Sequence, residues 1–131
     1  MSDRQQVTGI GGVFFKARDP GALAAWYRAH LGVPAREGET HALFTAPDAT
    51  GAPVQTVWSA FPAQTDYFGP GSAGFMINYR VADLDAMLAQ LRAAGAPVDD
   101  RIEESEYGRF GWATDPEGNR FELWQPPPDG L

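Results

Sequence analysis

Hydrophobic and polar positions along the chain follow first a strand pattern and then a helix pattern. Residues 7–17 form a run rich in β-branched and aromatic side chains, which is typical of a β-strand. Asp19 and Pro20 then predict the start of a helix, because aspartate caps free backbone amides and proline is tolerated in the first turn. Apolar residues recur at helical spacing from Leu23 onward, and Gly32 predicts a left-handed residue at the end of the helix.

The same order of patterns occurs again in the second half of the chain. Residues 75–81 predict a strand, Asp83 predicts a helix cap, and the apolar residues up to Gly95 predict a second helix. A Gly-x-Pro tripeptide follows each helix, at 32–34 and at 95–97. This repetition indicates two copies of one structural module.

Short strand-like runs complete each copy. Residues 41–45 and 109–113 predict the third element of the two copies, and each is followed by a turn and a last strand. The two turns, at 48–51 and 115–118, both begin with Asp and end with Gly, which suits a backbone that needs a positive φ. Each copy therefore reads as one strand, one helix and three further strands.

Two tandem βαβββ modules are the simplest architecture for this pattern, and the fold class is α+β. We place the modules at about residues 7–60 and 74–126, joined by a linker at 61–73 that is rich in Gly, Pro and aromatic residues. A module this short does not usually close its own sheet, so we expect both to pack together in one domain spanning residues 1–131. The helices would cover one face of each sheet, and the concave faces would line a shared cavity.

Composition and charge narrow the class of protein and its partners. The chain has 131 residues, of which 44% are hydrophobic, and a formal net charge of −7, which argues for a folded domain and against binding to nucleic acid or anionic membranes. The start is polar, no apolar stretch is long enough to cross a bilayer, and cysteine is absent. These features exclude a disulfide scaffold and predict a cytoplasmic protein. Signatures of kinases, serine hydrolases and Rossmann-type dehydrogenases are missing from the sequence.

Three groups of residues resemble the vicinal-oxygen-chelate superfamily, which includes glyoxalases, bleomycin-resistance proteins and extradiol dioxygenases. The resemblance covers about residues 7–126 and implies the fold described above. Members of this superfamily include metal-dependent lyases, isomerases, epimerases and dioxygenases as well as drug-sequestering proteins without a metal, so the fold does not assign the chemistry. The three groups are Ala17-Arg18-Asp19-Pro20 with Ala25-Trp26-Tyr27 and Leu31-Gly32, the run Tyr79-Arg80-Val81-Ala82-Asp83-Leu84-Asp85, and Asp115-Pro116-Glu117-Gly118-Asn119-Arg120-Phe121-Glu122-Leu123.

The resemblance also implies four metal-ligand positions, which are occupied here by Gly12, Gln55, Met76 and Glu122. Glycine has no side chain, methionine offers a soft thioether and glutamine a neutral carbonyl, which leaves Glu122 as the one ionisable ligand. Hard divalent ions need several oxygen or nitrogen donors. We therefore expect no intrinsic metal and no other cofactor, and a metal would require His41 or a loop acid as a substitute ligand.

The remaining cavity would have aromatic walls and few polar groups, which is typical of a small-molecule pocket. Glu122 is the candidate catalytic residue. Desolvation beside Met76 and Phe14 would suit it to act as a general base, an ion pair with Arg80 or Arg120 would hold it ionised, and an ordinary strand carboxylate is the third alternative. The predicted ligand-binding residues are Phe14, Gln55, Met76, Asn78, Arg80 and Trp124.

Several other residues have a structural and a functional interpretation. His30 is expected to interact with the end of the first helix, and His41 to have a structural or solvent-facing role. The acidic run at 99–106 indicates a solvated surface or, alternatively, a rim that attracts cations. Aromatic residues at 67–70 and 107–112 could form walls of a pocket or part of the core.

Three functional hypotheses follow. The first is a glyoxalase- or bleomycin-resistance-like protein that binds a small organic molecule without a metal. The second is a lyase or isomerase that acts on a carbonyl compound, with Glu122 as base and Asn78, Arg80 or Gln55 polarising the substrate oxygen. The third is a module that binds another protein. Association into a homodimer is expected in each case, because a half-open sheet rich in aromatic residues favours it.

Overall fold

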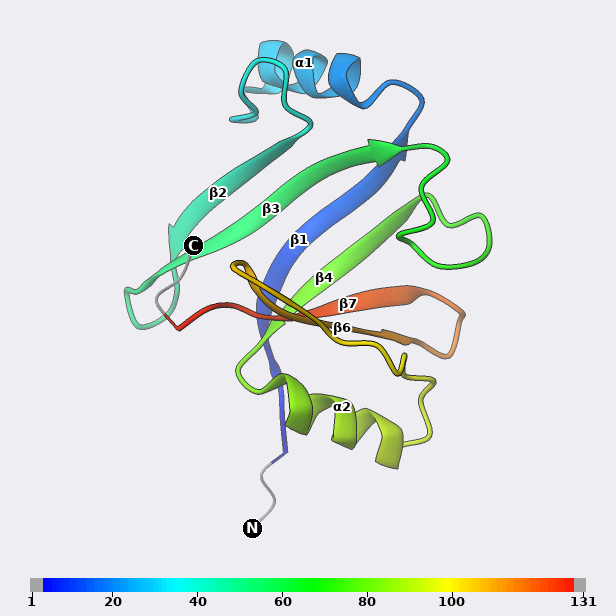
Figure 1. The fold of residues 1–131 in the computed structure, drawn as a ribbon. Coiled ribbons are helices and arrows are strands. Elements are labelled where there is room, and N and C mark those ends of the chain that lie inside the picture. The colour runs from blue at the N-terminus through cyan, green and yellow to red at the C-terminus, as the bar shows by residue number, and fades with distance from the viewer. Residues whose placement is uncertain (1–3, 129–131) are drawn as a thin grey trace. The chain divides into compact units, whose positions relative to one another are not determined.

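The computed structural model describes residues 4–128, and these residues confirm the predicted α+β fold with a repeated strand-helix-strand module. The second module contains one strand, one helix and three further strands, whereas the first has only two strands after its helix, because residues 32–40 form no strand. The strand-helix order of both modules can be followed in Figure 1. Both helices are short, and within the described residues no helix is long and apolar enough to cross a membrane. The elements are β1 (Val7–Ala17), α1 (Pro20–Leu31), β2 (His41–Pro47), β3 (Pro53–Pro62), β4 (Phe75–Val81), α2 (Leu84–Ala93), β5 (Glu103–Ser105), β6 (Gly108–Thr114) and β7 (Arg120–Gln125).

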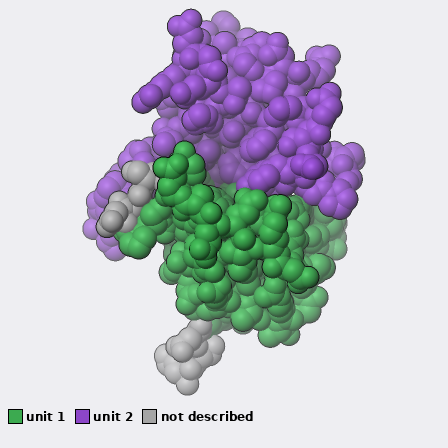
Figure 2. All heavy atoms as spheres, in the orientation of Figure 1, with its two compact units in different colours: residues 1–11, 77–131 green, residues 12–76 purple. Residues whose placement is uncertain are grey.

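The chain packs as two compact units, which Figure 2 distinguishes by colour. Unit 1 contains the residues up to 11 together with those from 77 onward, and unit 2 contains residues 12–76. Both boundaries fall inside strands, β1 and β4, rather than in the linker at 61–73. Each unit is a sheet of strands covered by one helix.

In unit 2, α1 packs against a sheet in which β3 lies between β2 and β1. The β1·β3 pair is parallel and the β2·β3 hairpin is antiparallel. Val13 and Phe15 pack with Ala24 of α1 and Trp58 of β3 in one apolar cluster. Since side chains alternate along a strand, Gly12, Phe14 and Lys16 lie on the opposite face, as the sequence predicted.

In unit 1, α2 packs against a sheet in the order β4-β7-β6-β5. Here β4·β7 is parallel and the two hairpins are antiparallel. The side of the sheet that faces α2 is apolar. Its buried cluster consists of Val81, Leu84, Met87, Leu88 and Leu123.

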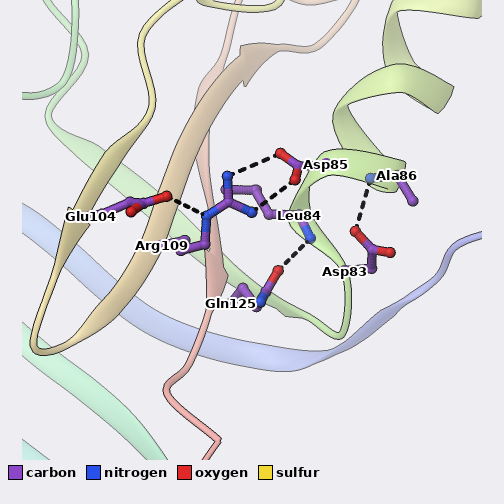
Figure 3. Close-up of polar contacts among 7 residues, drawn as sticks. All are labelled: Asp83, Leu84, Asp85, Ala86, Glu104, Arg109 and Gln125. Atoms are coloured by element: carbon purple, nitrogen blue, oxygen red, sulfur yellow. Dashed lines mark hydrogen bonds and ion pairs between the residues drawn. The ribbon is translucent and has the colours of Figure 1, made fainter.

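Polar contacts fix the beginning of α2 against this sheet (Figure 3). Asp83 Oδ1 accepts a hydrogen bond from the backbone N–H of Ala86 at 3.0 Å, which confirms the predicted cap. The backbone N–H of Leu84 donates to Gln125 Oε1 at 2.8 Å. Arg109 binds both carboxylate oxygens of Asp85, at 3.0 and 3.1 Å, and also Glu104 at 2.9 Å. These hydrogen bonds connect α2, β6 and β5, and the one from Arg109 lowers the pKa of Asp85.

The two predicted hairpin turns have the same structure. Asp48 Oδ1 accepts from the backbone N–H groups of Thr50 and Ala52, and Asp115 Oδ1 accepts from those of Glu117 and Asn119. The glycines that follow, Gly51 and Gly118, have φ values of 87° and 89°. Hydrogen bonds to the carboxylates, chiefly from Thr50 and Asn119, lower the pKa of both aspartates.

Candidate functional site

A buried carboxylate lies on the sheet face of unit 1 that points away from α2. Glu122 is 1% exposed, and it stands opposite Asn78 on β4 and Trp112 on β6 in the strand register. Asn78 Nδ2 donates to Glu122 Oε1 at 2.5 Å, and Trp112 Nε1 donates to Glu122 Oε2 at 2.9 Å. We call Asn78, Glu122 and Trp112 the Glu122 row.

Strand alternation explains why this row lies on that face. Phe121 and Leu123 pack toward α2, so Glu122 and Trp124 point the other way. A buried carboxylate costs stability unless hydrogen bonds compensate its lost hydration. The two N–H donors of the row supply part of that compensation.

Two cations lie over the ring of Trp112. The guanidinium of Arg101 is 4.8 Å and that of Arg120 is 5.5 Å from the ring centroid. Arg120 also pairs with Asp99 at 2.8 Å. A cation over an indole face is attracted by the ring, so these contacts hold the tryptophan that binds Glu122.

A second row follows one register step further along the strands. Arg80, Trp124 and Phe110 stand opposite one another on β4, β7 and β6. The rings of Phe110 and Trp124 are nearly parallel, with centroids 6.1 Å apart. Arg80 Nη1 donates to the carbonyl of Ile10 at 2.7 Å, and Trp124 Nε1 donates to that of Tyr107 at 2.7 Å. We call these three residues the Arg80 row.

The backbone of β1 covers part of both rows. A Cβ atom at Gly11 would collide with Asn78 Oδ1 and would come within 2.8 Å of Trp124 Cε3. Asn78 is 2% exposed, and its Oδ1 has no hydrogen-bond partner within the described residues. Only glycine permits this close approach of β1 to the amide.

Unit 2 contains the other predicted ligand-binding residues. Phe14, 8% exposed, has its ring 5.5 Å from that of Phe61, which stacks on Tyr67 at 5.4 Å. Phe68 is 2% exposed and meets Phe61 edge to face. The aromatic residues of the linker are therefore packed, and burial of Phe68 favours the core interpretation for that residue. Met76 is 1% exposed.

Alignment through the turn glycines makes Gln55 the counterpart of Glu122. The pairing within the two hairpins agrees with this alignment, but the pairing with the parallel strands does not. Gln55 stands opposite Thr45 on β2, just as Glu122 stands opposite Trp112 on β6. Across the parallel pair, however, Phe14 stands opposite Ser59, whereas its counterpart Asn78 stands opposite Glu122. The two hairpins thus match each other, but they pair with their parallel strands in different registers.

The four positions at which the family places metal ligands are poorly suited to a metal. The ring of Phe14 would lie 2.8 Å from a Cβ atom at Gly12, so the space of a side chain there is filled. Both oxygens of Glu122 already accept N–H donors. Within residues 4–128, no three His, Asp or Glu side chains cluster as metal ligands. His41 is exposed on β2 and lies 3.5 Å from Glu39. These donors do not fit the multidentate site that a hard divalent ion needs.

Trp112 is a candidate site residue that the sequence placed only among the aromatic residues of 107–112, without linking it to Glu122. Its role could have been found by counting back from the turn, because Thr114 pairs with Arg120 and the next position on the same face pairs Trp112 with Glu122. Of the predicted residues, Asn78 and Glu122 are brought together by a hydrogen bond, and Arg80 and Trp124 by register. Phe14, Gln55 and Met76 belong to unit 2.

The repeated strand-helix-strand modules and the carboxylate on the sheet face away from the helix define a protein of the glyoxalase type. A family model described as a Glyoxalase-like domain matches residues 12–124, and the chain belongs to this family. No curated protein sequence matches the chain.

Solved structures show the same fold at low sequence identity. A methylmalonyl-CoA epimerase from Mycobacterium tuberculosis is 22% identical, with 98% of this chain and 95% of that chain covered and a TM-score of 0.61. A variant of the Streptomyces coelicolor methylmalonyl-CoA epimerase, in complex with 2-nitronate-propionyl-CoA, is 19% identical, with coverage of 96% and 99% and a TM-score of 0.69. A glyoxalase/bleomycin resistance protein/dioxygenase superfamily member from Vibrio splendidus is 16% identical, with coverage of 93% and 99% and a TM-score of 0.52.

Proposed function

We propose that this protein binds a small organic molecule against the sheet face of unit 1 that points away from α2, and that it does so without an intrinsic metal. The main observation in support is that Glu122 is only 1% exposed, although it lies on the sheet face that does not pack against α2. A carboxylate is expensive to bury, so its presence on this face favours a role in binding over a role in packing. Asn78, Arg80 and Trp124 join Glu122 as the proposed ligand-binding residues of this unit, and Phe14, Gln55 and Met76 remain those proposed in unit 2.

The chemistry of the face supports an organic ligand over a metal. Its rows combine one carboxylate, one amide and one guanidinium with three aromatic rings, which is the composition of a small-molecule site. Both oxygens of Glu122 are engaged by N–H donors, and Gly12 cannot contribute a ligand. We also propose that the protein forms a homodimer and acts in the cytoplasm, on the basis of its exposed β2 strand and its cysteine-free sequence.

A thermal-shift screen of small carboxylates, keto compounds and CoA thioesters tests the binding proposal. Phe110→Leu should weaken the binding of a hit, because this ring stacks on Trp124 in the Arg80 row. Phe121→Leu is the matched control, since Phe121 packs on the opposite face toward α2. It should lower the melting temperature and leave the affinity unchanged. Hits whose affinity is the same in wild type, Phe110→Leu and Arg80→Met would contradict the proposed site.

A second candidate function is an isomerase that acts on a carbonyl compound with Glu122 as general base. The observation in its favour is the likeness in fold to the methylmalonyl-CoA epimerases described above. In such a reaction a base removes the proton next to the carbonyl and a proton returns to the same carbon. One oxygen of Glu122 would have to exchange its hydrogen bond from Asn78 or Trp112 for the substrate proton.

Solvent exchange separates this candidate from simple binding. Methylmalonyl-CoA incubated with the protein in deuterated water should gain deuterium at the carbon between its carbonyl groups, faster than without protein. Glu122→Gln should abolish the acceleration, with CoA thioester binding measured in parallel. Exchange at the uncatalysed rate with the wild-type protein excludes epimerase activity on this compound.

A further inference from the structure

A groove in unit 2 lies outside both rows. It is formed where β1 ends and α1 begins, and it has a volume of about 840 Å³. Its lining includes Lys16 and Arg18 from the end of β1 and Ala22, Trp26 and Tyr27 from α1. The groove is open to solvent, and its volume falls within the usual range for small-molecule sites.

Two cations of this groove have no carboxylate partner. Within the described residues, neither Lys16 nor Arg18 forms an ion pair, although the chain has a net charge of −7. Lys16 Nζ lies 5.6 Å from the ring centroid of Phe68. Asp19 also lines the groove, but its Oδ1 caps α1 by accepting from the N–H of Ala22 at 3.0 Å. Asp19 keeps its negative charge in this cap, but within the described residues it forms no ion pair with Lys16 or Arg18.

An exposed tryptophan forms the helix side of the groove. Trp26 is 52% exposed, whereas the other three tryptophans, Trp58, Trp112 and Trp124, are at most 8% exposed. Its ring contacts those of Tyr27 and His30, with centroids 5.3 and 4.8 Å away. A large ring held by aromatic neighbours and open to solvent is suited to stacking against a flat ligand.

We propose that this groove is a second binding site, which takes a small organic anion with a flat ring. Lys16 and Arg18 attract the carboxylate or another anionic group, and Trp26 stacks on the ring. The site is independent of the Glu122 row, because all of its residues belong to unit 2 and none of them is assigned a role in the function proposed above.

Indole N–H resonances provide the test, since each of the four tryptophans gives its own signal in a ¹⁵N-correlated spectrum. The probes are naphthalene-2-carboxylate, its neutral carboxamide, and cyclohexanecarboxylate, which is an anion without a flat ring. Naphthalene-2-carboxylate should shift the signal of Trp26 with saturation. The affinity of each of the other two probes should be at least about fivefold lower, because each lacks either the negative charge or the flat ring.

Variants locate the binding. Arg18→Met and Lys16→Met should each lower the affinity for naphthalene-2-carboxylate by about two- to fivefold, as expected for exposed charge pairs. Trp26→Leu should lower it by about tenfold. Arg36→Met is the matched control, because it removes the same charge from an exposed position of unit 2 that does not line the groove. It should leave the affinity within twofold of wild type.

Four results would overturn the proposal. Three of them are an unshifted Trp26 signal at millimolar probe, equal binding of the carboxylate and the carboxamide, and equal losses of affinity in Arg18→Met and Arg36→Met. Shifts confined to the signals of Trp112 and Trp124 would also overturn it, and they would instead support the site proposed in unit 1.

Discussion

The indole N–H of Trp112 donates to Glu122 Oε2 at 2.9 Å, and the two residues stand directly opposite each other on β6 and β7. Trp112 is 0% exposed and Glu122 is 1% exposed, so this hydrogen bond is shielded from solvent. Arg101 and Arg120 lie over the same indole ring. Trp112, which binds the carboxylate of the proposed site, is thus itself held in place by Arg101 and Arg120.

Trp112→Phe should destabilise the protein, because it leaves Glu122 Oε2 without this buried donor. The expected loss is about 1–3 kcal/mol of unfolding free energy beyond that from the smaller ring, measured by urea unfolding. Trp58→Phe is the control, since Trp58 lies in the apolar cluster of unit 2. Equal losses in the two variants would show that the hydrogen bond to Glu122 contributes nothing measurable.

Gly11→Ala should destabilise unit 1 strongly, because the added Cβ would collide with Asn78 Oδ1 and the ring of Trp124. Overpacking of this kind costs about 1–3 kcal/mol or more. Gly21→Ala is the matched control, as the nearest atom to its Cβ would be Asp19 Oδ1 at 3.8 Å and alanine favours a helix. Thermal unfolding should show a lower melting temperature for the first variant and an unchanged or higher one for the second.

Acid should weaken the two aspartate turns. Hydrogen bonds in the folded protein, chiefly from Asn119 and Thr50, lower the pKa of Asp115 and of Asp48 below the usual value of an aspartate. Their contribution to stability is therefore present above the unfolded pKa and is lost as the pH falls through the lower, folded one. Asp115→Ala should reduce the fall in stability between about pH 5 and pH 2, whereas Glu117→Gln, in the same turn, should reduce it less.

The proposed absence of an intrinsic metal is tested by elemental content before and after incubation with divalent ions, with thermal stability followed in parallel. We expect no stoichiometric metal and no stability gain, because the four family positions offer one carboxylate whose oxygens already accept hydrogen bonds. Stoichiometric Ni²⁺, Zn²⁺, Mn²⁺ or Fe²⁺ that disappears in Glu122→Ala would refute this proposal and promote a metal-dependent lyase or dioxygenase.

Light scattering at micromolar concentration should give the mass of a homodimer. The β2 strand lies at an edge of its sheet and exposes Leu43 by 42% and Phe44 by 44%, and such edges favour association. Leu43→Lys should shift the mass toward the monomer, while Leu31→Lys, at an apolar residue of α1 that is even more exposed, should not. A monomeric mass for the wild-type protein contradicts the proposal.

The sequence by itself determined the repeated strand-helix order, the helix caps and the two turns, but it predicted one strand too many in the first half. Each depends on residues within a few positions of one another: Asp83 caps Ala86, Asp48 accepts from Ala52, and Val13 and Phe15 share a face because strands alternate. The same alternation placed Glu122 and Trp124 on one face. These features are present in the structure because they depend on hydrogen bonds and backbone geometry between neighbouring residues, which tertiary packing leaves unchanged.

Only the tertiary structure decided which groups meet. The register of β6 on β7 makes Trp112 the hydrogen-bond partner of Glu122. The close approach of β1 brings Gly11 against Asn78. Trp26 is exposed because α1 buries little besides Ala24. Register and burial depend on how strands far apart in sequence pair and pack. A local pattern carries the periodicity of a strand, but it does not carry the offset at which that strand meets its neighbour.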